Sequence, residues 1–309
     1  MIEARHLSKS YGSTRAVDDL SFTVAAGQVT GFLGPNGSGK STTMRMIVGL
    51  DAPSAGEVTV GGRGYGKLRF PLHEVGALLD ANAVHPGRSA RNHLVWLADS
   101  NMIPRSRVDE VLGTVGLSEV AHRRAGEFSL GMGQRLGIAA ALLGDPGVLI
   151  FDEPVNGLDP EGILWVRHLL RSLADEGRTI LVSSHLMSEM ALTADHLIVI
   201  GRGKLLDSGS VADFIERSEG HHVRVLTPDA SALADLLRSK GAGVTADGPE
   251  GLAVKGMECR DVGILAAGAG LTLYELSTWR ASLEDAFMEL TGEHADFRAT
   301  TGNPQRSAS

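Results

Sequence analysis

The chain has 309 residues, of which 43% are hydrophobic, so it is long and apolar enough for one large α/β domain and a smaller appended one. Its formal net charge of -8 argues against a nucleic-acid-coating protein, and its single cysteine, Cys259, excludes an intramolecular disulfide. No secretory signal is visible, and the most apolar runs are shorter than the ~20 residues that a membrane-spanning helix needs. We therefore expect any role at a membrane to depend on a partner.

Short apolar runs alternate with helical patterns in the first half of the chain, as in a doubly wound α/β domain. The pattern predicts buried strands at residues 29–33, 148–151 and 179–183, and a helix over residues 41–50. Residues 88–125 show a helical pattern with little strand signal, which predicts an inserted helical subdomain.

The turn Gly201-Arg202-Gly203 separates two apolar runs, so residues 195–209 are predicted to form a hairpin. We expect the first domain to cover residues 1–217 and a linker to follow at residues 218–220.

The pattern of apolar residues changes after the linker. The pattern predicts strands at residues 222–226, near Val244, at 252–254 and at 271–274, with helices at 231–240 and 260–267. This β-α-β-β-α-β order predicts a small ferredoxin-like α+β domain over residues 222–292. Ser282 is expected to cap a last helix, and the polar residues 299–309 are expected to be disordered.

A complete G-x-x-x-x-G-K-[ST] pattern lies between the first predicted strand and its helix, at Gly34-Pro35-Asn36-Gly37-Ser38-Gly39-Lys40-Ser41-Thr42. Glycines let backbone amides turn toward phosphate oxygens, and the helix start adds unpaired amides and a positive dipole end. Lys40 is expected to reach the β- and γ-phosphates, and the Ser41 hydroxyl to hold Mg²⁺. The alternative, a glycine-rich structural turn, is disfavoured by the complete spacing and the correct flanks.

Two adjacent carboxylates, Asp152 and Glu153, follow the buried strand at residues 148–151. Asp152 is placed to support Mg²⁺, directly or through water. Glu153, pointing the other way, could polarise a water for in-line attack on a γ-phosphate. A strand that merely ends in solvated acids is the alternative, and the phosphate loop in the same chain disfavours it.

With these motifs, residues 1–220 resemble the ATP-binding cassette (ABC) ATPases, the nucleotide-binding subunits of ABC transporters. The resemblance implies that Tyr11 stacks on adenine. It also identifies Phe128-Ser129-Leu130-Gly131-Met132 with the family's Leu-Ser-Gly-Gly-Gln signature, from which it departs at three of five positions. Ser129 and Gly131 are retained, and the resemblance implies that they contact the γ-phosphate bound to an opposing subunit.

Three further residues follow from the resemblance. Asp159, in Asn156-Gly157-Leu158-Asp159, is expected in the loop that communicates across the dimer. His185, after Ser183-Ser184, is expected to be the switch histidine that bonds the γ-phosphate and helps to orient the water. Asp80 aligns with the glutamine that links Mg²⁺ to the membrane subunit; an aspartate can ligate Mg²⁺, although it is shorter and repels phosphate without the metal.

The resemblance implies a P-loop fold of ABC type, with a mixed sheet, helices on both faces and a helical subdomain. It implies that ATP is sandwiched between two cassettes, either two copies of this chain or this chain and a related subunit, and that hydrolysis drives a separate membrane permease at the cytoplasmic face. The single cassette and the segment Ser282-Leu283-Glu284-Asp285-Ala286-Phe287 resemble bacterial exporter ATPases of the daunorubicin type, which implies export of a drug, antibiotic or lipid.

Two other classes of function stay open. A soluble ABC ATPase of DNA repair or translation is disfavoured by the single cassette and single cysteine, and we expect no nucleic-acid partner. A non-catalytic nucleotide sensor would not need Glu153 and His185. The C-terminal domain, in turn, either stabilises a dimer or senses a ligand.

Overall fold

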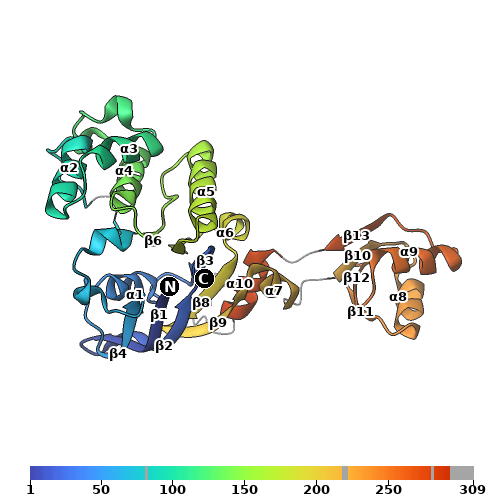
Figure 1. The fold of residues 1–309 in the computed structure, drawn as a ribbon. Coiled ribbons are helices and arrows are strands. Elements are labelled where there is room, and N and C mark those ends of the chain that lie inside the picture. Colours follow the sequence, from blue (N-terminus) through green and yellow to red (C-terminus); the bar gives the residue numbers. More distant parts are fainter. Residues whose placement is uncertain (81–82, 218–221, 280–281, 293–309) are drawn as a thin grey trace, which may run out of the picture. The chain divides into compact units, whose positions relative to one another are not determined.

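A six-stranded sheet forms the centre of the first of two units, Met1–Asp213 (Figure 1). The computed structural model describes residues 1–80, 83–217, 222–279 and 282–292. The strand order is β5-β6-β7-β3-β8-β9, in which the first five strands are parallel and β9 is antiparallel. The strands are β3 (Gln28–Leu33), β5 (Val75–Leu78), β6 (Val148–Asp152), β7 (Thr179–Ser183), β8 (His196–Gly201) and β9 (Lys204–Ser210).

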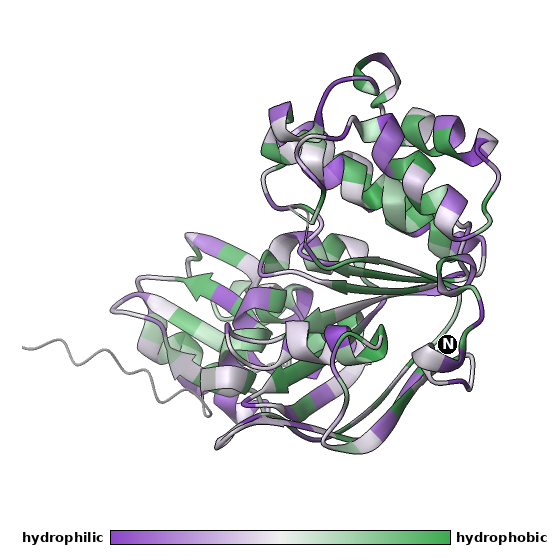
Figure 2. Cartoon of the chain, turned by 90° about the vertical axis from the view of Figure 1, so that its left-hand side faces the viewer, coloured by the Kyte–Doolittle hydropathy of each residue, from purple (hydrophilic) through white to green (hydrophobic). Residues whose placement is uncertain are grey.

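Helices cover both faces of this sheet, as its near-continuous apolar strands require (Figure 2). Helix α1 (Lys40–Ile47) belongs to a core cluster on one face, whereas α5 (Pro160–Asp175) contacts β3 and β7 without joining that cluster. Helix α6 (Met187–Thr193) packs against α5. The predicted α/β fold with a mixed sheet and helices on both faces is therefore confirmed.

Helix α1 is shorter than the predicted residues 41–50. Gly49 has a φ of 68° and donates its N–H to the Met46 carbonyl, while the Leu50 N–H bonds the Arg45 carbonyl. These two bonds are the Schellman pattern that ends a helix at a left-handed glycine. The predicted helix, residues 41–50, is therefore too long, because it continues past Gly49.

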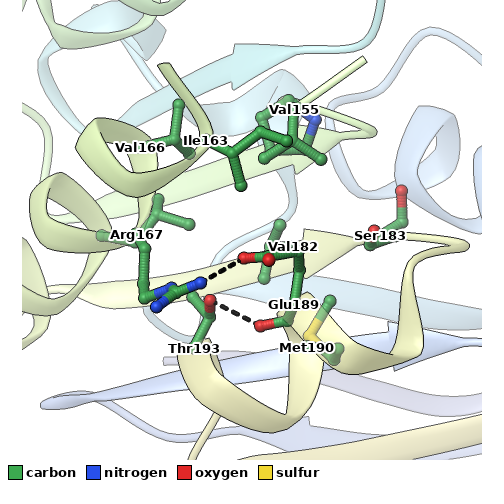
Figure 3. A pocket seen from close by; sticks show the side chains of 12 residues that line it. Val155, Ile163, Val166, Arg167, Val182, Ser183, Glu189, Met190 and Thr193 are labelled. Carbon is green, nitrogen blue, oxygen red and sulfur yellow. Dashed lines mark hydrogen bonds and ion pairs between the residues drawn. The ribbon is translucent and has the colours of Figure 1, made fainter. Parts of the chain in front are cut away.

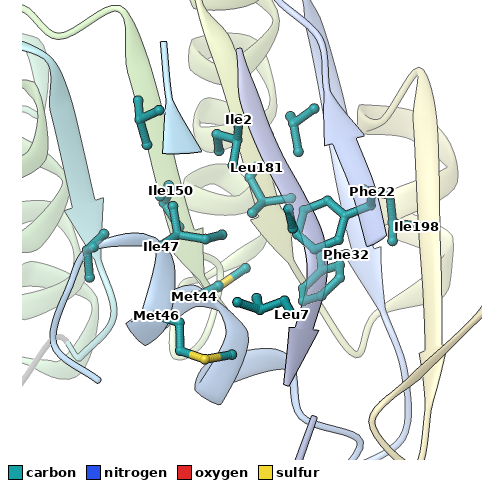
Figure 4. Packing of buried hydrophobic residues seen from close by; sticks show 14 of the residues in the cluster. Ile2, Leu7, Phe22, Phe32, Met44, Met46, Ile47, Ile150, Leu181 and Ile198 are labelled. Carbon is teal, nitrogen blue, oxygen red and sulfur yellow. The ribbon is translucent and has the colours of Figure 1, made fainter. Parts of the chain in front are cut away.

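A three-stranded antiparallel sheet, for which the sequence analysis made no prediction, closes the core on the other side of α1. Its order is β2-β1-β4, with β1 (Ile2–Tyr11), β2 (Thr14–Val24) and β4 (Ala55–Val60). Met44 and Ile47 of α1 pack between the two sheets, beside Ile150 and Leu7 (Figure 4). The rings of Phe22 and Phe32 join the sheets with centroids 5.6 Å apart. Each fully buried aromatic of this kind stabilises the fold by roughly 1.5–3 kcal/mol.

The helical subdomain contains α2 (Ala90–Ser100), α3 (Ser106–Thr114) and also α4 (Leu130–Leu142), which packs against both and lies beyond the predicted residues 88–125. Ser89 caps α2 by accepting the Asn92 N–H at 3.2 Å. Short 3₁₀ turns cover Tyr65–Lys67, Pro71–His73, Ser118–Val120 and Ala125–Glu127. Helix α7 (Val211–Arg217) follows β9.

The second unit contains a four-stranded antiparallel sheet of order β11-β12-β10-β13. The apolar sides of α8 and α9 pack against this sheet to form its core. The elements are β10 (His222–Leu226), α8 (Ala230–Ser239), β11 (Gly243–Ala246), β12 (Gly251–Lys255), α9 (Cys259–Gly268) and β13 (Glu275–Trp279). Their β-α-β-β-α-β order and antiparallel neighbours are those of a split β-α-β arrangement.

The strand predicted at residues 271–274 is wrong, because β13 is Glu275–Trp279. Leu271 and Leu273 pack against the core and alternate like a strand, as the prediction assumed. Leu276 packs against the same core, yet it lies three positions after Leu273. A regular strand repeats with a period of two, so the chain cannot be one strand through both residues.

The last helix, α10 (Leu283–Gly292), begins after Ser282. The Asp285 N–H donates to Ser282 Oγ at 3.1 Å, and the Ser282 N–H donates to Asp285 Oδ2 at 2.9 Å. This reciprocal pair is a capping box with aspartate at the third position. The predicted linker at residues 218–220 and tail at 299–309 lie outside the described residues. In the described part of the chain, no helix has both the length and the apolar composition to span a bilayer.

Candidate active site

The candidate residues gather because their strands are parallel neighbours that end at one edge of the sheet. The loop of residues 34–42 follows β3, Asp152 ends β6, and His185 follows β7. Asp80, two positions beyond β5, stands at the same edge and is exposed. Open α/β sheets bind their ligands outside this carboxyl edge.

Two glycines of the loop are required by close backbone approach. A Cβ on Gly34 would lie 2.5 Å from the Ile200 carbonyl oxygen, and one on Gly39 would lie 2.5 Å from the Ala16 carbonyl oxygen. Gly39 also has a φ of 103°, which favours glycine. As the N-cap of α1 it supplies no side-chain bond, and the first turn contains no acid. The amides at this helix start therefore suit an anion.

Lys40 folds back over the loop: Nζ donates to the Gly34 carbonyl at 2.6 Å and to the Pro35 carbonyl at 3.2 Å. Burial lowers the pKa of this ammonium, while the charges of Glu153 and Asp152 act in the opposite direction. Among the described residues, the buried Ser38 hydroxyl has no hydrogen-bond partner. A buried hydroxyl and a buried ammonium beside exposed amides fit a polyphosphate, which offers charged acceptors to each.

Asp152 joins the phosphate loop to the neighbouring strands. Ser41 Oγ donates to its Oδ2 at 2.7 Å, and Ser183 Oγ donates to its Oδ1 at 2.5 Å. Ser183 also accepts the Glu153 N–H at 3.0 Å. Ser183 was predicted only as the end of a strand, although a small hydroxyl residue that closes a buried apolar strand is a signal for such a role.

Glu153 and His185 form a pair at the same edge. Glu153 Oε2 lies 2.7 Å from His185 Nδ1 and accepts the His185 N–H at 3.3 Å. Because an ionised carboxylate only accepts, Nδ1 of His185 holds the hydrogen. The Glu153 side chain thus lies next to the hydrogen bonds that join Ser41, Asp152 and Ser183, which we call the aspartate network. It is 23% exposed, so its carboxylate can contact a water molecule.

The donor set suits Mg²⁺. Ser41 and Asp152 offer oxygen atoms, which this hard cation prefers. Within the described ranges, no three or more His, Cys, Asp or Glu side chains gather as a group that could hold a metal. Magnesium commonly uses only one or two carboxylates, together with waters and substrate phosphates, so a sparse protein site is compatible with it.

Tyr11 lies at the end of β1, with its ring half-exposed. Its hydroxyl donates to Asp51 Oδ2 at 2.9 Å, which raises the pKa of the phenol, and Asp51 also accepts Arg45 Nε at 2.7 Å. Lys9 Nζ stands over the ring, 5.0 Å from its centroid. The Tyr11 hydroxyl is therefore held by Asp51, which is itself bonded to Arg45 in the last turn of α1.

Three predicted residues lie at the starts of helices α4 and α5. Ser129 caps α4 by accepting the Met132 N–H at 3.3 Å, and Asp159 caps α5 by accepting the Gly162 N–H at 2.9 Å. A Cβ on Gly131 would meet only the Gly157 oxygen and Leu158 Cδ2 within 4 Å. No atom of residues 34–42 comes that close.

An apolar pocket lies between α5, α6 and β7 (Figure 3). Arg167 of α5 and Glu189 of α6 form an ion pair on its wall, and Thr193 Oγ1 donates to the Glu189 carbonyl at 2.8 Å. Ser183 reaches its lining, so the pocket adjoins the aspartate network. Its mostly apolar wall lacks the donors that a phosphate requires.

Comparison with known proteins identifies the family. A family model described as ABC transporter matches residues 17–156, and a model described as a domain of unknown function matches residues 221–284. Over 301 residues the chain is 38% identical to the uncharacterized ABC transporter ATP-binding protein YhcH of Bacillus subtilis (strain 168), covering 95% of this chain and 96% of the relative. The chain belongs to the ABC transporter ATPases.

This ABC ATPase is also 43% identical over 210 residues to the bacitracin transport ATP-binding protein BcrA of Bacillus licheniformis, covering 67% of this chain and 69% of the relative. Its fold resembles the structure of cbiO1 from Clostridium perfringens, part of the ABC transporter complex cbiONQ, with a TM-score of 0.61 and 27% identity. That match covers 70% of this chain and 90% of the other. The predicted family and ATP-binding function are confirmed.

Proposed function

We propose that this ABC ATPase hydrolyses ATP at composite sites between two subunits, either two copies of this chain or this chain and a related one. One observation supports this above all. Lys40, Asp152 and Glu153 gather at one sheet edge, whereas Gly131 packs on its own Gly157 and Leu158, out of contact with its own phosphate loop. Ser129 and Gly131 are therefore left for the phosphate of the opposing subunit. A closed two-fold pair of this kind is self-limiting.

Within each site, the backbone amides of the loop and Lys40 bind the phosphates. The loop residues are Gly34, Pro35, Asn36, Gly37, Ser38, Gly39, Lys40, Ser41 and Thr42. Ser41, Asp152 and Asp80 would hold Mg²⁺, which neutralises phosphate charge when bound. Tyr11 would stack on adenine, and Asp159 would lie in the loop facing the partner.

Glu153 would accept the proton of the attacking water, and His185, whose Nδ1 is engaged by Glu153, would turn its other ring nitrogen toward the γ-phosphate. General bases of this kind contribute about 10²–10⁴-fold to a rate.

The cargo and the membrane partner are inferred from the relatives. One relative transports bacitracin by its printed name, and cbiO1 is part of a transporter complex. These support a peripheral subunit at the cytoplasmic face of the membrane that drives a separate permease and exports a drug, antibiotic or lipid. Neither relative is described as acting on nucleic acid, which disfavours a soluble role in repair or translation.

Glu153→Gln tests the catalytic proposal. It should retain nucleotide affinity and ATP-driven dimerisation, while steady-state phosphate release falls about 10²-fold or more. Glu161→Gln, which changes an exposed acid at the start of α5, is the matched control and should keep the parent rate. A Glu153→Gln protein that releases phosphate as fast as the parent would show that another group activates the water.

The transport proposal is tested by tagging the chain in its own cells, extracting the membranes with detergent and identifying what copurifies. We expect an integral membrane protein of about six spans. Turnover that rises with added nucleic acid, without a membrane partner, would instead favour the soluble role.

A further inference from the structure

A buried glutamine on the signature helix contacts the backbone of Glu153. Gln134 lies on α4, is 4% exposed, and donates from Nε2 to the Glu153 carbonyl oxygen at 2.8 Å. The side-chain amide of Gln134 therefore bonds to the backbone just after β6 and does not face solvent.

The Glu153 peptide needs such support. Glu153 has a φ of 52°, in the left-handed region that a residue with a side chain rarely adopts. Its N–H is held by Ser183 Oγ at 3.0 Å, and its carbonyl also accepts the Asn156 N–H at 3.2 Å. A strained conformation persists only where the surrounding structure holds it, so these bonds determine where the carboxylate points.

The same helix also bears the signature residues. Ser129 caps α4 and Gly131 packs in its first turn, so Gln134 follows both within about one further turn. A hydrogen-bonded helix moves as a unit over so short a distance. Any shift of Ser129 against an opposing nucleotide would therefore reach the Glu153 carbonyl.

We propose that Gln134 is a positioning residue, which sets the backbone of Glu153 and links the signature end of α4 to the water-activating carboxylate of the same chain. In this role Gln134 acts through the Glu153 backbone, to which its side chain donates. The inference rests on the role proposed for Glu153 above.

The test compares Gln134→Met with Arg135→Met in the full chain, using MgATP. Methionine keeps the length of the side chain and removes the donor. Arg135 is the matched control, because it bonds the Val115 carbonyl at 3.1 Å and stacks on Trp165 from the same helix, without touching Glu153. We expect Gln134→Met to lower kcat about 10- to 100-fold, with the affinity for nucleotide and ATP-driven dimerisation within twofold of the parent. Arg135→Met should keep the parent kcat.

Gln134→His provides a second variant, since its Nε2 lies the same number of bonds from the backbone and can donate. It should recover most of the kcat that Gln134→Met loses. Three results would overturn the proposal: a Gln134→Met kcat within twofold of the parent, an equal loss in Arg135→Met, or parallel loss of affinity and kcat. Glu153→Gln is measured alongside. If Glu153→Gln keeps the parent kcat, the proposed role of Glu153 fails. If Glu153→Gln loses activity but Gln134→Met keeps the parent kcat, the role of Glu153 stands and Gln134 has only a structural role.

Discussion

Ser41 and Asp152 lie 111 positions apart in the sequence, yet the Ser41 hydroxyl donates a 2.7 Å hydrogen bond to Asp152 Oδ2. The bond joins the start of α1, which follows β3, to the end of β6, and only β7 lies between these two strands in the sheet. It brings the oxygen atoms proposed for Mg²⁺ together beside Lys40.

Lys40→Ala should abolish both nucleotide binding and ATP-driven dimerisation, because the loop then lacks its one buried ammonium. Fluorescent-nucleotide titration and light scattering with ATP measure the two effects. Lys67→Ala, which removes an exposed lysine from a 3₁₀ turn, should change neither. Retained ATP-driven dimerisation in Lys40→Ala would count heavily against a nucleotide-bridged dimer.

Asp80→Asn should weaken Mg²⁺-dependent turnover more than ATP binding, since it removes a charge that attracts the cation from the carboxyl edge. The measurement is phosphate release across a Mg²⁺ titration, with nucleotide affinity in parallel. Asp109→Asn, at an exposed carboxylate paired with Arg91, is the control. Unchanged turnover at limiting Mg²⁺ would remove Asp80 from the proposed metal site.

Tyr11→Ala should weaken ATP binding by about 1–3 kcal/mol, the value of stacking one base on an aromatic ring. Tyr11→Phe keeps the ring and loses only the bond to Asp51, so it should bind within a few-fold of the parent. Inorganic tripolyphosphate, which lacks a base, should bind all three proteins alike. Equal ATP affinity in Tyr11→Ala and the parent would show that adenine stacks elsewhere.

Gly203→Ala should lower nucleotide affinity through the hairpin turn behind the phosphate loop. The Gly203 N–H donates to the Ser38 carbonyl at 2.9 Å, its φ is 79°, and an added Cβ would lie 2.8 Å from the Ala16 oxygen. Gly12→Ala is the control, because its φ of 59° imposes similar strain in open space. The positive φ should cost each variant about 1 kcal/mol of stability, the contact with Ala16 should add to this cost in Gly203→Ala, and only Gly203→Ala should alter nucleotide affinity. Equal affinities would mean that the turn does not shape the loop.

Acid should destabilise the helical subdomain through His93. This side chain of α2 is buried, and burial first, then Arg88, lowers its pKa from the ordinary value of 6.5. Because the folded-state pKa lies below the unfolded one, the unfolded chain binds the proton first, and stability falls as pH decreases through 6.5. The Tm of His93→Gln should fall less than that of the parent when the pH is lowered from about 7.5 to 5.5. Exposed His168→Gln should behave like the parent; equal slopes in all three would contradict the assignment.

The fold could be predicted best where its signal is local. Strands β3, β6 and β7 are continuous apolar runs, and the hairpin of β8 and β9 is marked by its glycine turn. The β1, β2 and β4 sheet was missed, because the amphipathic alternation in β2 is interrupted and because β4, which pairs with β1, lies beyond α1 in the sequence. The start of β13 was predicted wrongly, because Leu271 and Leu273 alternate as in a strand although they lie in the connection before it.

The sequence by itself determined the phosphate loop, the Asp152–Glu153 pair and His185, because each is a contiguous pattern whose spacing expresses its chemistry. Tertiary structure alone decided which of them meet. It placed Ser183 between Asp152 and Glu153, used the carboxylate of Asp159 as a helix cap, and brought Gln134 to the Glu153 carbonyl. Such contacts join residues from different strands and helices, so their partners depend on strand order and helix packing and cannot be read from local spacing.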